Sequence, residues 1–237
     1  MKHLISLLAF SLLIGCDGEK SNVAPSEGPI EEAASETKPP EAVSVNPNLK
    51  YEVKGGEVTI TGTNKRPSGE LIIPKIIEGK PVTSIGTQAF SECTSLRSIT
   101  IPDSVISIGI NAFFRCTSLT SITIPDGVTS IGVSAFYGCT SLTSITIPDS
   151  VTSIGHNAFA DCTSLTSITI PDGVTTIGDF AFSYCNSLTA VTFLGDAPKI
   201  ENDAFKQSSP NIYRKADAKG WGDTFAGRPV KLITEKP

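Results

Sequence analysis

The segment from Cys116 to Gly138 reads C-T-S-L-T-S-I-T-I-P-D-G-V-T-S-I-G-V-S-A-F-Y-G, and its pattern returns every 23 residues. Four columns keep this spacing over at least five copies each, which is the signature of a stacked repeat and predicts a solenoid. The columns are Ile85, Ile108, Ile131, Ile154 and Ile177; Phe90, Phe113, Phe136, Phe159, Phe182 and Phe205; Cys93, Cys116, Cys139, Cys162 and Cys185; and Leu96, Leu119, Leu142, Leu165 and Leu188.

A single unit indicates how each coil closes. Ile122 and Ile124 alternate with Thr123, the pattern of a strand with one buried face. Pro125-Asp126-Gly127 then predicts a turn. Eight side chains are expected to point inward: Leu119, Ile122, Ile124, Val128, Ile131, Ala135, Phe136 and Cys139. One unit cannot bury them alone, so copies must stack with strands about 4.8 Å apart, giving a mainly β fold.

The repeat L-x-x-I-x-I-P-x-x-V-x-x-I-G-x-x-A-F-x-x-C resembles the BspA-type leucine-rich repeat of many bacterial surface proteins. The resemblance covers residues 71–205. It implies a leucine-rich-repeat solenoid of about six units, a right-handed coil of short strands joined by turns or 3-10 segments. Leu71-x-Ile73-Pro74 fits the start of a degenerate first unit, with about five extra residues before Val82.

Both ends of the solenoid are expected to carry caps, because an open end would expose apolar core and strand edges. Residues 49–70 resemble the family's N-terminal cap. Residues 206–237 resemble its C-terminal cap, with Trp221 as a cap residue rather than a ligand contact. Between Leu188 and Phe205 the repeat loses its Cys and Pro.

The first residues predict a targeting signal. A basic start precedes an apolar run from Leu4 to Ile14, and Leu13-Ile14-Gly15-Cys16 resembles a bacterial lipobox. We therefore predict a lipoprotein signal peptide in residues 1–15 and a lipid anchor on Cys16, since several acyl chains give stable anchoring. An ordinary cleaved signal with a chance cysteine is the alternative. The expected location is the bacterial cell envelope, lipid-anchored, on its surface or periplasmic side.

Residues 16–48, with the anchor cysteine at their start, are predicted to form a disordered tether. They hold five prolines, no aromatic residue, and seven acidic residues against two lysines. Such a segment cannot bury enough apolar surface to offset its chain entropy. An ordered acidic interaction arm is the alternative.

Composition excludes several classes of function. The 237 residues carry a net charge of −5, which belongs to the tether, so the repeats are nearly neutral. Without basic runs we expect no nucleic-acid partner. No stretch of 18 apolar residues exists, so no membrane-spanning helix is expected.

The cysteine column invites a redox or metal function. We interpret it as buried free thiols acting as small apolar groups, with disulfides among Cys93, Cys116, Cys139, Cys162 and Cys185 left open. No histidine accompanies the column at ligand spacing. The aspartates that follow each Pro are interpreted as turn residues rather than calcium ligands. We therefore expect no metal and no cofactor.

Catalysis has one candidate pair. His156 is the only histidine after signal cleavage, and Asp179 stands one unit later, about 5 Å away if the strands stack. There is no nucleophile-elbow motif, so we interpret the pair as a surface ion pair and expect no enzyme.

The remaining candidates for function are residues on the surface of the solenoid. The outward columns of the main strand face form a flat Ser/Thr lattice that suits polysaccharide: Arg97, Thr120, Thr143, Thr166 and Thr189; Ser98, Ser121, Ser144 and Ser167; Thr100, Thr123, Thr146, Thr169 and Thr192. The opposite side varies, and its exposed aromatic residues with arginine are typical of interfaces. The candidate binding residues there are Phe114, Arg115, Tyr137, His156, Asp161, Phe180 and Tyr184. Neutral drift is the alternative for these positions.

We therefore predict a monomeric binding or adhesion module for a macromolecular partner, a protein or a polysaccharide. A passive envelope or spacer protein without a dedicated ligand is the alternative.

Overall fold

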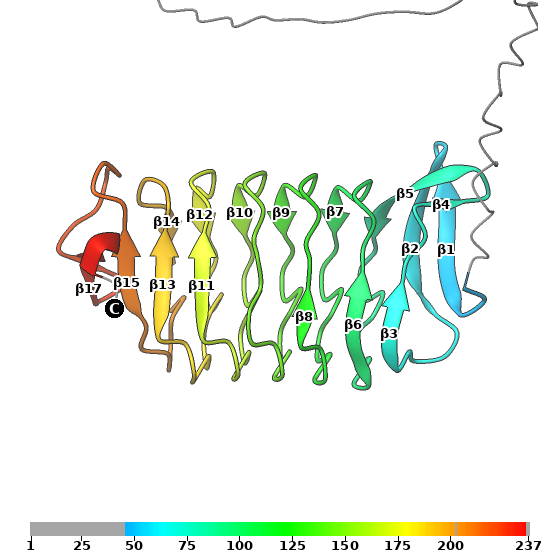
Figure 1. The fold of residues 1–237 in the computed structure, drawn as a ribbon, viewed down its shortest axis with the longest axis horizontal. Helices are drawn as coiled ribbons and strands as arrows, with labels where there is room; N and C mark the ends of the chain where they lie inside the picture. The colour runs from blue at the N-terminus through cyan, green and yellow to red at the C-terminus, as the bar shows by residue number, and fades with distance from the viewer. Residues whose placement is uncertain (1–45, 202, 236–237) are drawn as a thin grey trace, which may run out of the picture. The chain divides into compact units, whose positions relative to one another are not determined.

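A computed structural model describes residues 46–201 and 203–235, which form a solenoid of β-coils (Figure 1). Among these residues the single helix is the 3-10 helix η1, Ile233–Glu235. The predicted mainly β repeat solenoid is therefore confirmed. The signal peptide, Cys16 and the tether up to residue 45 lie outside the described residues.

One side of the solenoid is a parallel sheet formed by short strands that each end at the repeated isoleucine. Neighbouring strands pair 23 residues apart, as Ile85 with Ile108 and Ile131 with Ile154. The strands are β5 (Lys80–Ile85), β7 (Ser107–Ile108), β9 (Ser130–Ile131), β10 (Ser153–Ile154), β12 (Thr176–Ile177) and β14 (Lys199–Ile200).

The glycine after each of these strands except β14 allows the coils to approach closely. A Cβ atom on Gly155 would lie 2.8 Å from the backbone nitrogen of Val133 in the preceding coil. Atoms at that distance overlap, so a side chain here would force the coils apart. The Ile-Gly column is thus a packing requirement of the stack.

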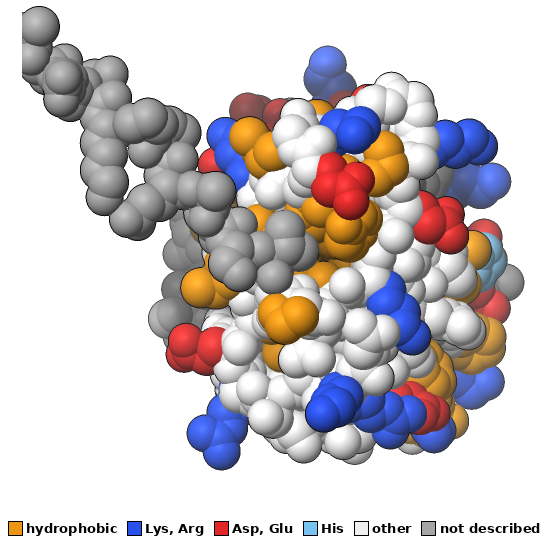
Figure 2. All heavy atoms as spheres, turned by 90° about the vertical axis from the view of Figure 1, so that its right-hand side faces the viewer, with side chains coloured by type: hydrophobic (Ala, Val, Ile, Leu, Met, Phe, Trp, Pro, Cys, Tyr) orange, Lys and Arg blue, Asp and Glu red, His pale blue; other side chains and the backbone are white. Residues whose placement is uncertain are grey.

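The N-terminal end of this sheet carries two hairpins. β1 (Leu49–Lys54) pairs antiparallel with β2 (Glu57–Thr63), and β2 joins β5 in parallel. β4 (Ile76–Ile77) folds antiparallel onto β5, so this small hairpin holds the extra residues of the first repeat. Figure 2 looks onto this end and shows apolar side chains among charged ones.

A second side of the coil carries the L-x-x-I-x-I pattern. β3 (Gly69–Ile72), β6 (Leu96–Thr100) and β8 (Ser121–Ile122) form one parallel sheet. A single bridge between Thr123 and Thr146 continues the row. A second sheet follows, with β11 (Ser167–Ile170), β13 (Ala190–Phe193), β15 (Asn211–Arg214), β17 (Arg228–Leu232) and the antiparallel β16 (Thr224–Phe225).

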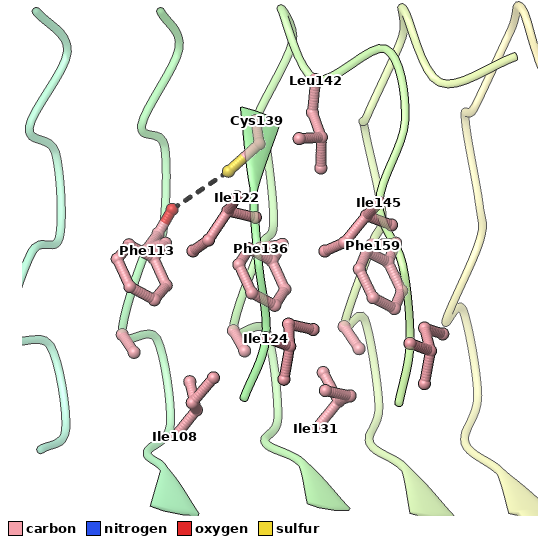
Figure 3. Packing of buried hydrophobic residues seen from close by; sticks show 14 of the residues in the cluster. Ile108, Phe113, Ile122, Ile124, Ile131, Phe136, Cys139, Leu142, Ile145 and Phe159 are labelled. Carbon is pink, nitrogen blue, oxygen red and sulfur yellow. Dashed lines mark hydrogen bonds between the residues drawn. The ribbon is translucent and has the colours of Figure 1, made fainter. Parts of the chain in front are cut away.

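The core consists of the predicted inward columns. All eight side chains expected to point inward in the Cys116 unit are at most 7 % exposed. The phenylalanine rings stack along the coils from Phe90 to Phe205, with neighbouring centroids 5.3 to 5.5 Å apart. Figure 3 shows Phe113, Phe136 and Phe159 in this row. Each aromatic pair adds about 0.5–1.5 kcal/mol beyond its buried area.

The third side of the coil is closed by main-chain hydrogen bonds between the segments that carry Ala-Phe. The Phe113 amide donates to the Ala135 carbonyl at 2.8 Å, and the Arg115 amide donates to the Tyr137 carbonyl at 2.7 Å. We call these segments the Ala-Phe loops, residues 86–93, 109–116, 132–139, 155–162, 178–185 and 203–208. Successive Ala-Phe loops therefore lie side by side and hold one another.

The five described cysteines are free and buried. The thiol of Cys139 donates to the Phe113 carbonyl at 3.3 Å (Figure 3), and Cys116, Cys162 and Cys185 make the same bond to the carbonyl 26 residues earlier. Ser208 continues the column, since its hydroxyl donates to the Phe182 carbonyl at 2.7 Å. The repeat thus loses its cysteine here but keeps the hydrogen bond.

Trp221 belongs to an aromatic cluster at the C-terminal end. Its ring centroid lies 4.9 Å from that of Phe193 and 4.8 Å from that of Phe225. Its indole nitrogen donates to the Gly195 carbonyl at 3.2 Å. Trp221 therefore packs against the C-terminal end of the core, and the assignment of residues 206–237 to a C-terminal cap stays a prediction.

Candidate functional site

The seven candidate residues all lie on Ala-Phe loops, but they do not form one cluster. Phe114, Arg115 and Tyr137 occupy two neighbouring loops, and Phe180 and Tyr184 share a later one. His156 and Asp161 lie on the loop between them. The structure therefore offers two separate groups of aromatic side chains on one side of the solenoid.

The first group is built around an aromatic pair. The rings of Phe114 and Tyr137 stack with centroids 5.0 Å apart and planes inclined by 13°. Both residues are half-buried. They occupy the same position in successive loops, so the coil spacing itself brings the rings into contact.

Arg115 lies over the Phe114 ring of this pair. Its guanidinium carbon lies 5.3 Å from the centre of the Phe114 ring. Its stem lies over the next loop, where a Cβ atom on Gly138 would be 3.1 Å from the Cγ of Arg115. The absence of a side chain at Gly138 therefore leaves the room in which Arg115 lies.

Two aliphatic residues that were not among the candidates extend this group. Ile110 is 48 % exposed and Val133 is 38 % exposed, and the amide after Ile110 donates to the Val133 carbonyl at 3.0 Å. Their column holds Thr87, His156 and Asp179 in other copies, a contrast that a comparison of columns could have revealed. We call Ile110, Phe114, Arg115, Val133 and Tyr137 the aromatic–arginine patch.

The second group is more polar. The Lys206 ammonium lies 5.1 Å from the centre of the Phe180 ring and 3.3 Å from the Asp203 carboxylate. Tyr184 is 48 % exposed. The cation over Phe180 is thus partly neutralised by its own neighbour.

Four candidate residues have left-handed backbones: Arg115, Asp161, Phe180 and Tyr184 have φ between 53° and 59°. Equivalent positions share this conformation, among them Asn111, Ser134 and Asn157, so the coil requires it. Bulky side chains carry a cost there of about 1–2 kcal/mol that glycine avoids. Phe180 and Tyr184 therefore occupy positions where bulky side chains do not favour stability.

The expected pairing of His156 with Asp179 is wrong. The His156 Nε2 lies 3.9 Å from the Oε1 of Glu201, and the Asp179 carboxylate accepts the amides of Phe180 and Asp203 at 3.1 and 3.2 Å. Glu201 takes the place of the repeated glycine in the last unit, and its side chain reaches back towards His156. The local backbone amides satisfy Asp179 first.

The Ser/Thr lattice is partly engaged within the fold. The hydroxyls of Thr120, Thr166 and Thr189 each donate to the carbonyl 23 residues earlier, at 3.1 to 3.4 Å. Thr192 was expected to face outward, but it is only 6 % exposed. Its strand β13 pairs with β15, which places the larger Tyr213 beside it. Recognition of polysaccharide by this face stays a prediction.

Neither a metal centre nor a membrane-spanning helix is found in the described part of the chain. No three His, Cys, Asp or Glu residues of 46–201 and 203–235 gather as metal ligands. No helix formed by these residues is long and apolar enough to cross a membrane.

A cavity of about 430 Å³ is lined by Asp172, Asp196, Asp217 and Lys215 among others, and Asp196 accepts the Lys219 amide at 2.6 Å.

The family model described as the BspA type leucine-rich repeat region matches residues 83–211 in 6 copies. The chain belongs to this family. BspA-type repeats therefore account for the 23-residue unit, and leucine-rich-repeat proteins are typically protein-interaction modules whose fold is typically not enzymatic. No curated protein matches the chain.

Solved structures of bacterial leucine-rich-repeat proteins are similar to this BspA-type chain. A protein from Bacteroides ovatus is 26 % identical with a TM-score of 0.60, over 78 % of this chain and 66 % of that one. A leucine-rich cell surface protein from Faecalibacterium prausnitzii is 31 % identical with a TM-score of 0.59, over 75 % of this chain and 55 % of that one. The leucine-rich-repeat protein of T. pallidum is 28 % identical with a TM-score of 0.53, over 62 % and 84 %. The chain spans less than two thirds of the first two proteins.

Proposed function

We propose that this protein is a binding module of the bacterial cell envelope that holds a macromolecular partner, a protein, on its Ala-Phe loops. The observation that carries the proposal is the aromatic–arginine patch, where the Phe114 ring stacks on that of Tyr137 and the Arg115 guanidinium lies over Phe114. Aromatic residues and arginine dominate the binding energy of protein interfaces.

The loops are suited to this role because they are rigid before any partner arrives. Each Ala-Phe loop is hydrogen-bonded to its neighbours through its main chain, and the stacked phenylalanine column lies directly beneath. A surface that is ordered in advance loses little conformational entropy on binding. The mechanism proposed is thus display of a preformed surface.

The envelope location is proposed from the lipobox-like Leu13-Ile14-Gly15-Cys16 and from the F. prausnitzii relative, which is described as a cell surface protein. A Cys16→Ala variant should move from the membrane fraction to the soluble fraction of cells. The native chain should require detergent for release. Continued membrane retention of the variant would contradict lipidation at Cys16.

Binding is tested with a variant that carries Arg115→Ala, Tyr137→Ala and Tyr184→Ala together. The native chain should capture a protein from immobilised envelope or extracellular-matrix preparations, and the triple variant should lose that capture. A matched control carries Arg97→Ala, Thr120→Ala and Thr123→Ala on the strand face, where all three residues are exposed. This control variant should capture the partner to the same extent as the native chain does.

The competing proposal is a passive spacer of the envelope without a dedicated ligand. It predicts that neither the native chain nor either triple variant captures a partner. In that case the unequal residues on the Ala-Phe loops reflect neutral drift, and the binding proposal fails.

A further inference from the structure

We propose that the aromatic–arginine patch takes a segment of a protein partner that presents a carboxylate next to apolar side chains. This inference rests on the proposed binding function and names the chemistry of its partner. It is carried by three observations on Arg115: it has no acidic partner among the described residues, it is held against Phe114, and exposed apolar side chains lie on the same two loops.

Arg115 is a cation without an acidic partner in the described part of the chain. The acidic residue one coil earlier in its column is Glu92, whose Oε2 lies 2.7 Å from the Nη2 of Arg66. Glu92 is therefore already engaged by a different arginine. The next acidic residue of the column is Asp161, two coils further on and separated from Arg115 by Gly138. The guanidinium thus keeps its donors for an external acceptor.

Arg115 is also held in place. The Phe114 ring supports the guanidinium from one side at 5.3 Å, and the stem occupies the space above Gly138. A fixed arginine loses less side-chain entropy on binding than a free one. Its planar fork suits two parallel hydrogen bonds to a carboxylate.

The exposed apolar side chains on the two loops that carry Arg115 and Tyr137 favour a peptide over other acidic ligands. Ile110 and Val133 are exposed on the same two loops, and their apolar surface suits apolar side chains of a partner. A nucleic acid or a polyuronate repeats its charge along the chain and needs repeated cations. The column reads Glu92, Arg115, Gly138, Asp161, Tyr184, so it offers one cation only.

The experiment selects ligands for the mature full-length chain in detergent micelles from a phage library of random dodecapeptides. Peptides in which Asp or Glu stands beside Leu, Ile or Phe should be enriched. The best peptide is then synthesised in two forms, with its acidic residue and with the corresponding amide. Affinities of both forms are measured for the native chain, Arg115→Gln, Arg115→Lys and Arg97→Gln. The last is the matched control, because Arg97 is an exposed cation on the strand face.

The expected result is a double-mutant cycle. Arg115→Gln should weaken binding of the acidic peptide about 30-fold, and the amide peptide should lose about as much on the native chain. Combining the two changes should cost little more, since both remove the same contact. Arg115→Lys should bind the acidic peptide more tightly than Arg115→Gln does but more weakly than the native chain, because lysine lacks the planar fork. Arg97→Gln should change affinity less than about twofold, because Arg97 lies on strand β6 and not on the Ala-Phe loops.

Other outcomes overturn the inference in distinguishable ways. If Phe114→Ala abolishes binding while Arg115→Gln leaves it unchanged, the binding face stands and the carboxylate assignment fails. Equal losses for Arg97→Gln and Arg115→Gln would show attraction without a specific contact, which also contradicts it. Retention of alginate with no peptide enriched would replace the peptide by a polyuronate. If neither peptide nor alginate binds, the proposed function fails with the inference.

Discussion

Arg228 stands 23 residues after Phe205, where the next phenylalanine of the column would fall, and its guanidinium carbon lies 5.2 Å from the centre of the Phe205 ring. Its Nη2 donates to the Phe205 carbonyl at 2.8 Å and to the Ser208 carbonyl, and its Nη1 donates to the Ala226 carbonyl at 2.6 Å. Burial lowers the pKa of Arg228. One side chain thus covers the last ring of the stack and satisfies the carbonyls at its end.

Replacement of Arg228 tests this cap. Arg228→Ala should lower the free energy of unfolding by about 2 kcal/mol, because buried carbonyls lose a charged donor. Denaturant unfolding followed by circular dichroism measures the change. Arg97→Ala, at an exposed position, should stay within about 0.5 kcal/mol of the native chain. Equal stability of the two variants would show that Arg228 does not hold the end of the stack.

The cysteine column makes a second prediction. Cys139→Ala removes the thiol donor of the Phe113 carbonyl, which keeps only the Cys116 amide at 3.2 Å, so we expect a loss of about 1 kcal/mol. Cys139→Ser should cost less, because Ser208 already makes this bond at the end of the column. Chemical denaturation of both variants decides the order. If serine proves worse than alanine, the carbonyl bond is not what the column provides.

Stability at alkaline pH should report the same thiols. Burial raises the pKa of Cys139 and of Cys185 from 9.0 to about 12. The unfolded chain therefore releases thiol protons above pH 9 while the folded chain keeps them, so the free energy of unfolding falls as pH rises from 9 to about 12. The slope is at most about 1.4 kcal/mol per pH unit for each thiol.

The measurement compares two chains, since lysine and tyrosine also titrate in this range. The melting temperature of the native chain should fall more steeply between pH 9 and 11 than that of a variant carrying Cys139→Ser and Cys185→Ser. Below the ordinary thiol pKa of 9.0 the two curves should run parallel. Parallel curves across the whole range would mean that these thiols ionise as easily when folded.

The glycine column makes the last prediction. Gly155→Ala places a methyl group 2.8 Å from a backbone atom that cannot rotate away, and we expect a loss of about 2–3 kcal/mol. Gly222→Ala is the control, because a Cβ atom there would lie 3.6 Å from the nearest atom. Thermal unfolding should leave the control close to the native chain. Comparable losses in both would contradict the coil-spacing argument, because Gly→Ala by itself lowers the entropy of the unfolded chain and does not destabilise the fold.

The inward columns were predictable because each coil meets copies of itself. A side chain such as Phe136 packs between Phe113 and Phe159, so the repeat already contains its environment. Residues at the C-terminal end of the solenoid cannot be predicted in this way. Ser208 and Arg228 keep the spacing of 23 residues but change residue type, and only their hydrogen bonds show that they continue the columns.

The site was predictable in part for the same reason. Departures from the repeat pointed to Phe114, Arg115 and Tyr137, and equal positions in neighbouring coils bring the rings together. The partner of His156 was not predictable, because Glu201 reaches it from an adjoining column. The freedom of Arg115 depends in the same way on Arg66, a cap-side residue that engages Glu92.

The sequence by itself determines the solenoid, its inward columns and the loops that vary. A period of 23 residues imposes the same neighbours on every buried side chain, so local chemistry and stacking suffice. The tertiary structure decides which outward groups are engaged: Asp179 by backbone amides, Glu92 by Arg66, and the lattice hydroxyls by carbonyls of the preceding coil. The partner of an outward side chain depends on how far that side chain extends across coils and columns. The repeat period carries no information about this.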